Sequence, residues 1–243
     1  MRSIVSIRVP SRSNKTQAMP GKGFLRSSGF RSSTICYDKR QTCRLQVCRK
    51  IEKRKWRMAK IIKDISGALF PTPVVLVTTV DPDGKPNIIT LAWVGIVSSS
   101  PFTLSVAIRP SRYSHGLLGA VPELAVNVPT KEIVASTDYC GTVSGRTVDK
   151  FAGCGLTPVP ADEIKAPLIK ECPINLECRV TNTLSLGTHD VFISEVIKVH
   201  IDEELVDESG RVDYGRLAPF VYLGMDYWTL AEKIGHYGYS KKG

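Results

Sequence analysis

The strongest constraint on the fold is a run of β-branched residues that leads directly into a tight turn. Residues 74–80 read Val-Val-Leu-Val-Thr-Thr-Val, a composition typical of a strand. Asp81-Pro82-Asp83-Gly84 follows, with proline at the second turn position, and residues 87–97 supply a second strand. The sequence therefore predicts a β-hairpin near the start of the folded region.

Further short strands are predicted with few helices between them. Strands are expected over 102–108, 124–128, 174–183 and 191–201, and helices over 60–69, 113–120, 131–139 and 146–151. This pattern is typical of a small β-barrel with peripheral helices, so the expected fold class is mainly β. The sequence has neither a strand–GxGxxG–helix nor a GxxxxGK[ST] element, which argues against Rossmann and P-loop nucleotide binding.

The net charge of +10 is concentrated at the N-terminal end. Residues 1–57 contain 16 Lys and Arg against Asp38 and Glu52, a net charge of +14. Residues 58–243 contain 17 basic and 21 acidic side chains, a net charge of −4. The sequence therefore divides into a basic leader, residues 1–57, and one domain, residues 58–243, long enough for a sizeable core.

The basic leader has three open interpretations. Its apolar residues show no period, which indicates an unstructured tail or sequence upstream of a start codon at Met58. Its Arg- and Ser-rich, acid-poor composition is also typical of an organellar transit peptide. A nucleic-acid-binding arm is the third interpretation, disfavoured because the leader has few aromatic residues for base stacking.

Cysteine usage and hydropathy bear on the cellular location. The seven cysteines form no Cys-x-x-Cys pair and lie near no histidine at zinc-ligand spacing, so free thiols and no metal are expected. No apolar stretch approaches the roughly 20 residues of a membrane-spanning helix, which excludes an integral helical membrane protein. The leader also lacks the apolar block of a secretory signal, and a cytoplasmic location is expected.

The densest polar cluster, residues 108–115, is expected where a strand ends and a helix begins. Arg109, Ser111, Arg112 and Ser114, with the free N–H groups of the helix start, predict a site for phosphate or another dianion. The alternative is an exposed loop in which Ser114 only caps the helix.

A second basic pair follows in the predicted helix over 146–151, for which Ser144 is the expected N-cap. Arg146 and Lys150 are four residues apart, so they are expected to share a helix face and to add positive charge to the anion site. A solvated cationic face balanced by Asp149 is the alternative.

The strand that begins at Asn87 has features of a binding surface. Thr90, Ala92 and Gly95 are small or carry hydroxyl groups, so a planar ligand could approach the backbone closely. Trp93 could stack on such a ligand, although a tryptophan in a strand lies in the core more often.

His189 and Asp190 suggest acid–base catalysis only weakly. Neighbours in a strand point to opposite faces, so the pair is poorly placed for a proton relay. No GxSxG nucleophile motif accompanies it, which disfavours a hydrolase.

Four segments together resemble the flavin reductase-like, FMN-binding split-barrel family and its flavoredoxin branch. They are residues 87–93, 108–114, 144–151 and 187–190, in the family's order and spacing, within a resemblance that covers residues 58–238. The resemblance implies a Greek-key split β-barrel that forms a homodimer and binds FMN near the dimer interface. It does not extend to the basic leader.

The resemblance also implies roles for individual residues. Ile89, Thr90, Leu91 and Ala92 are expected beside the isoalloxazine edge. The ribityl phosphate of FMN is expected to be surrounded by Arg109, Ser111, Arg112, Tyr113 and Ser114. The cofactor-binding set is completed by Asn87, Trp93, Arg146 and Lys150. His189 falls where reductases of the family carry Gly-Asp-His near the nicotinamide, but the order here is Gly-Thr-His-Asp, which leaves NAD(P)H use open.

An FMN-dependent oxidoreductase is therefore the first hypothesis, either an NAD(P)H:flavin reductase or a flavoredoxin-type electron carrier. The chemistry is expected to reside in the flavin, with no catalytic side chain. Alternatives are a non-catalytic flavin-binding or sensing module on the same fold, and nucleic-acid binding through the basic leader. The electron donor and acceptor stay open.

Overall fold

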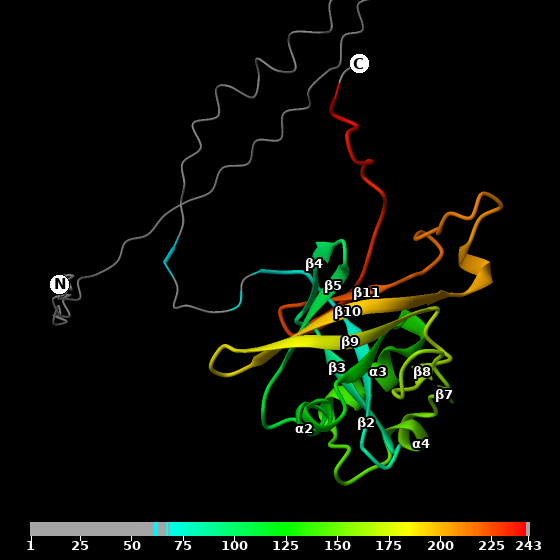
Figure 1. Ribbon diagram of the computed structural model, residues 1–243. Coiled ribbons are helices and arrows are strands. Elements are labelled where there is room, and N and C mark those ends of the chain that lie inside the picture. The colour runs from blue at the N-terminus through cyan, green and yellow to red at the C-terminus, as the bar shows by residue number, and fades with distance from the viewer. Residues whose placement is uncertain (1–60, 63–66, 68, 242–243) are drawn as a thin grey trace, which may run out of the picture. The chain divides into compact units, whose positions relative to one another are not determined.

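A computed structural model of the chain describes residues 61–62, 67 and 69–241 (Figure 1). The strands are β1 Thr72–Pro73, β2 Val75–Val80, β3 Pro86–Leu91, β4 Val94–Ser99, β5 Phe102–Ile108, β6 Glu123–Val128, β7 Pro158–Val159, β8 Leu168–Ile169, β9 Ile174–Ser185, β10 Asp190–Ile201, β11 Phe220–Leu223 and β12 Asp226–Thr229. The helices are α2 Tyr113–Ala120, η1 Lys131–Ile133, α3 Val134–Thr142, α4 Lys150–Cys154 and η2 Glu203–Leu205. The basic leader and most of the predicted helix over 60–69 lie outside the described residues.

One seven-stranded antiparallel sheet organises the domain, in the order β3-β2-β6-β9-β10-β5-β4. The two edge strands, β3 and β4, are consecutive in the chain, with only Ala92 and Trp93 between them. Because Leu91 and Val94 are therefore at most about 10 Å apart, the sheet curls until its edges approach each other there. The result is an incompletely closed barrel, which confirms the mainly β class. The β9–β10 hairpin is its longest strand pair (Figure 1).

The barrel interior holds the largest apolar cluster. β2 is buried along its whole length and contributes Val75 and Val77 to this cluster. Leu76, between them, belongs to a second cluster with residues of α3 and α4. A strand covered on both faces has no polar side, which explains why residues 74–80 read as an almost continuous apolar run.

The prediction of one continuous strand over 87–97 is wrong, because this segment forms two strands. The chain is strand from Pro86 to Leu91 and again from Val94 to Ser99, because residues 92–93 cross from one edge of the sheet to the other. By contrast, the strand expected over 102–108 and the helix expected over 113–120 are confirmed with the same bounds.

The predicted helix over 146–151 is displaced toward the C-terminus. α4 begins at Lys150, and its N-cap is Asp149, whose Oδ1 accepts a hydrogen bond from the N–H of Ala152 at 3.2 Å. Ser144 instead opens a turn, in which its carbonyl accepts the N–H of Thr147 at 3.1 Å. None of the helices in the described part of the chain is long and apolar enough to traverse a lipid bilayer.

Asn127 in β6 is a fully buried amide that joins three other strands. Its Nδ2 donates to the Leu76 carbonyl at 3.0 Å, and its Oδ1 accepts from the N–H of Ile169 at 3.1 Å and from Asn175 Nδ2 at 2.8 Å. We expect Asn127→Ala to lower the free energy of unfolding by about 2–4 kcal/mol, because several buried polar groups lose their partner.

Urea denaturation measures this loss as a lower midpoint with an unchanged slope. The control is Asn182→Ala in the exposed part of β9, which is expected to stay within about 0.5 kcal/mol of wild type. Equal midpoints for the two variants would contradict the role given to Asn127.

Candidate functional site

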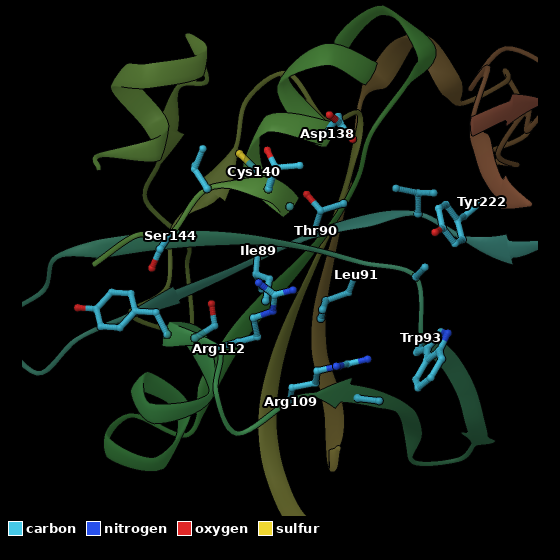
Figure 2. Close-up of a pocket in the computed structure, with 18 of the residues that line it drawn as sticks. Ile89, Thr90, Leu91, Trp93, Arg109, Arg112, Asp138, Cys140, Ser144 and Tyr222 are labelled. Carbon is cyan, nitrogen blue, oxygen red and sulfur yellow. The ribbon is translucent and has the colours of Figure 1, made fainter. Parts of the chain in front are cut away.

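A cavity of about 780 Å³ lies between β3, the start of α2 and the end of α3. Its volume is in the range of small-molecule sites, about 300–1,000 Å³. Every residue that the sequence analysis assigned to a cofactor lines it, namely Asn87, Ile89, Thr90, Leu91, Ala92, Trp93, Arg109, Ser111, Arg112, Tyr113, Ser114, Arg146, Lys150 and His189. Figure 2 shows Arg112 and Ser144 on one side, Trp93 and Tyr222 on the other, and Thr90 and Leu91 between them.

The start of α2 carries positive charge that no acid in its first turn balances. Arg112 is the N-cap residue, and its side chain makes no capping hydrogen bond. Ser114 is not the cap either, because it is the second residue of the helix, and its buried Oγ accepts a hydrogen bond from Asn87 Nδ2 at 2.7 Å. With Arg109 just before it, this helix start can hold an anion.

Asn87 leaves a buried acceptor free beside the helix start. Within the described residues, its Oδ1 has no hydrogen-bond partner. Gly145 packs against this amide so closely that a Cβ at position 145 would lie 1.9 Å from the Oδ1 atom. The Asn87 amide therefore joins the start of α2, through Ser114, to the turn that contains Gly145.

Arg146 lies in the turn before α4 and not on a helix face shared with Lys150, so that prediction is wrong. Its Nη1 donates to the Ser111 carbonyl at 3.3 Å, and its guanidinium carbon lies 5.3 Å from the centre of the Tyr113 ring. Arg146 therefore stabilises the loop before α2 by contacting the residues on either side of Arg112.

Lys150 is buried beneath β3 and joins it to α3. Its Nζ donates to the carbonyls of Ile88 at 2.7 Å and Cys140 at 2.6 Å. Burial lowers the pKa of Lys150, because loss of water disfavours the charged ammonium. The cavity wall thus contains a cation whose hydrogen-bond partners in the described chain are backbone carbonyls.

His189 and Asp190 point to different partners, as the alternation of side chains predicts. His189 Nε2 accepts from Arg109 Nε at 3.3 Å, and its ring centre is 4.5 Å from that of Trp93. Burial, and then the charge of Arg109, lower the pKa of His189. Asp190 Oδ2 is 2.7 Å from His115 Nε2. Trp93 is 54% exposed and lines the cavity, so it does not lie in the core, which was the alternative considered for it.

The C-terminal hairpin supplies a wall that the sequence analysis missed. Tyr222, Met225 and Tyr227 of the β11–β12 hairpin line the cavity. Tyr227 donates its hydroxyl to Asp138 Oδ1 at 2.9 Å, and burial, followed by Asp138, raises the pKa of Tyr227 to about 12. The aromatic density of residues 219–239 was the available signal, but nothing in it indicated which part of the domain the hairpin would cover.

Comparisons with known proteins show the family and the fold of the chain. Residues 67–230 match a family model described as a flavin reductase like domain. Flavoredoxin of Desulfovibrio vulgaris (Miyazaki F) is 30% identical, with a TM-score of 0.71 over 75% of this chain and 100% of its own. Flavoredoxin from Methanosarcina acetivorans is 35% identical, with a TM-score of 0.68 over 75% of this chain and 97% of its own.

A third structure bears on the fold alone. A Shewanella frigidimarina protein with a split barrel domain is 21% identical, with a TM-score of 0.64 over 70% of this chain and 87% of its own. Together with the sheet order described above, it confirms the split-barrel fold.

The close contact between Gly145 and Asn87 can be tested by adding one methyl group. We expect Gly145→Ala to destabilise the domain by about 1–3 kcal/mol, because the new Cβ overlaps the Asn87 amide. Gly119→Ala in α2 is the matched control, since a Cβ there meets nothing within 4 Å.

The control substitution is expected to stabilise the helix by about 0.4–1 kcal/mol. Thermal unfolding of both variants gives the comparison. Equal melting temperatures for Gly145→Ala and Gly119→Ala would contradict the close contact between Gly145 and Asn87.

Proposed function

The chain belongs to the flavin reductase-like family, and from that premise we propose that it binds FMN in the cavity and acts as an FMN-dependent oxidoreductase. One observation carries the proposal: a helix start flanked by Arg109 and Arg112, with no acid in its first turn, opens into a cavity of suitable size. Bound FMN would supply hydride and single-electron chemistry at its N5 atom. The protein's part is to bind and orient the cofactor and to set the local charge.

The α2 end of the cavity fits a ribityl phosphate. Arg112 would hold the phosphate through charge-assisted hydrogen bonds, helped by the N-terminus of α2 and by Arg109 once that side chain releases His189. Asn87 supports this end from below, because its Nδ2 donates to Ser114 in the first turn of α2. Arg146 supports this end through the Ser111 carbonyl.

The other end of the cavity fits a flat, partly apolar ring. Ile89, Thr90, Leu91 and Ala92 line it along the end of β3. Trp93 and Tyr222 lie on the same side of the cavity (Figure 2), where an isoalloxazine ring could contact aromatic side chains. Lys150 places a buried positive charge in the wall, which would favour an anionic form of the ring over a neutral one.

We also propose a homodimer that completes this site. Trp93, Ile96 and Val97 are 54%, 69% and 55% exposed, and β4 is an edge strand of the sheet. Leu186, 69% exposed, follows β9 in the turn before His189, which contacts Trp93. Trp93 lines the cavity, so a second copy that covers the exposed apolar residues of β4 would also cover this wall of the site.

Reductase and carrier functions differ in their electron donor. The Trp93 and His189 rings, which line the cavity and are tilted 41° to each other, offer an aromatic surface against which a nicotinamide could lie as the second ligand. Anaerobic NADH or NADPH added to the FMN-loaded chain decides between the two functions: bleaching of the flavin band indicates a reductase. A flavin that only dithionite bleaches indicates a carrier.

The phosphate assignment predicts the effect of removing one arginine. In the full chain, Arg112→Ala is expected to weaken FMN binding by about 10- to 100-fold, the loss typical of one hydrogen bond to a charged group. Quenching of FMN fluorescence measures the affinity. Arg211→Ala, in an exposed turn outside the cavity, is the control and should bind FMN like wild type. Equal affinities for both variants would remove Arg112 from the site.

The dimer proposal predicts that a charge in the exposed patch separates the subunits. Ile96→Asp is expected to yield a monomer, because an unpaired carboxylate would be buried in the interface. Light scattering during size-exclusion chromatography gives the mass directly. Ser99→Asp, at the exposed end of the same strand, controls for added charge. A wild-type mass of one chain would contradict the dimer.

A further inference from the structure

Two cysteines from different helices meet behind the cavity wall. Cys140 is in α3, Cys154 is the last residue of α4, and their Sγ atoms are 3.7 Å apart. Both are free thiols, as are Cys172 and Cys178. Cys140 is fully buried and lines the cavity, whereas Cys154 is only half-buried.

We propose that Cys140 and Cys154 form a reversible disulfide, a modification site whose oxidation state changes the cavity. A disulfide requires the sulfurs to approach from 3.7 Å to about 2.05 Å. Cys154 can make this movement because α4 has only five residues and is followed directly by Gly155, where φ is +69°. Glycine adopts this left-handed conformation without steric cost, so the end of α4 can adjust.

The difference in exposure sets the order of the reaction. The Cys154 thiolate attacks a low-molecular-weight disulfide, and one small thiol leaves with a proton from solvent. The Cys140 sulfur then attacks Cys154 Sγ in the mixed disulfide, and the second small thiol leaves with the proton that Cys140 loses. Two protein thiols are thereby oxidised, and one small disulfide is reduced to two thiols.

The burial of Cys140 makes the second step the slow one. Burial, followed by the neighbouring Cys154, raises the pKa of the Cys140 thiol to about 12, although the charge of Lys150 opposes the rise. Because the thiolate is the nucleophile, closure of the disulfide is expected to accelerate as the pH rises through the alkaline range.

Lys150 connects the pair to the cavity. Cys154 Sγ donates to the Lys150 carbonyl at 2.7 Å, and Lys150 Nζ donates to the Cys140 carbonyl at 2.6 Å. The disulfide removes the Cys154 S–H donor and pulls the end of α4 toward α3 across this lysine. Oxidation is therefore expected to shift Lys150 and the Cys140 backbone. The effect on FMN binding rests on the proposed function, whereas formation of the disulfide does not.

Peptide mapping of the full chain tests the disulfide directly. The protein is equilibrated in buffers of reduced and oxidised glutathione, free thiols are blocked with iodoacetamide, and trypsin is added. Residues 132–146 then carry Cys140 and residues 151–165 carry Cys154, each as the one cysteine of its peptide. We expect the two peptides to be linked in oxidising buffer and to separate with dithiothreitol.

Two variants control this experiment. Cys154→Ser is expected to abolish the linked peptide, while Cys178→Ser, in the barrel core, is expected to retain it. Circular dichroism checks that both variants are folded. Separate alkylation of Cys140 and Cys154 at every glutathione ratio would overturn the proposal. So would a link from Cys140 to Cys172, which packs in the same apolar cluster.

FMN titration of the oxidised and reduced forms tests the link to the cavity. In wild type, the FMN dissociation constants of the oxidised and reduced forms are expected to differ at least about threefold. In Cys154→Ser, the same two treatments are expected to give equal constants. Equal constants in wild type would overturn the effect on the cavity. Absence of FMN binding in both forms would refute the proposed function and leave the peptide result intact, so the two failures can be told apart.

Discussion

The connection through Ala92 and Trp93 is the constraint on which the rest of the domain depends. Because two residues join opposite edges of a seven-stranded sheet, the sheet curls into a barrel that stays open at one side. The same connection brings the end of β3 to the rim, where it meets Arg109 at the end of β5 and His189 before β10. The cavity is thus a direct consequence of how the sheet closes.

Local charge, and not the net charge, describes what the cavity can bind. The domain has a net charge of −4, yet its cavity is lined by four basic side chains, Arg109, Arg112, Arg146 and the buried Lys150, against one acid, Asp138. A buried ammonium held by two carbonyls is costly unless a ligand offsets its charge. The uncapped start of α2 adds to the same positive potential. An anionic cofactor with a phosphate at one end suits this distribution, which is why the proposed function centres on FMN.

Sequence reasoning succeeded where the determinants are local. The β-branched run of β2 and the helix after Arg112 were predicted from neighbouring residues, and the split barrel followed from the resemblance. The break at residues 92–93 was missed because Ala-Trp carries no turn signature, and only the closure of the sheet requires it. The Asn87–Gly145 contact, the wall formed by β11–β12 and the Cys140–Cys154 pair join residues distant in sequence, so a linear pattern could not reveal them.

The most direct test of the central claim is a titration of the full chain with FMN and, in parallel, with riboflavin. The two ligands share the isoalloxazine ring and ribityl chain, and they differ in the phosphate. If the start of α2 holds the phosphate, FMN saturates at one molecule per chain, and riboflavin binds at least about 100-fold more weakly. Equal affinities for the two ligands, or no binding of either, would contradict the account.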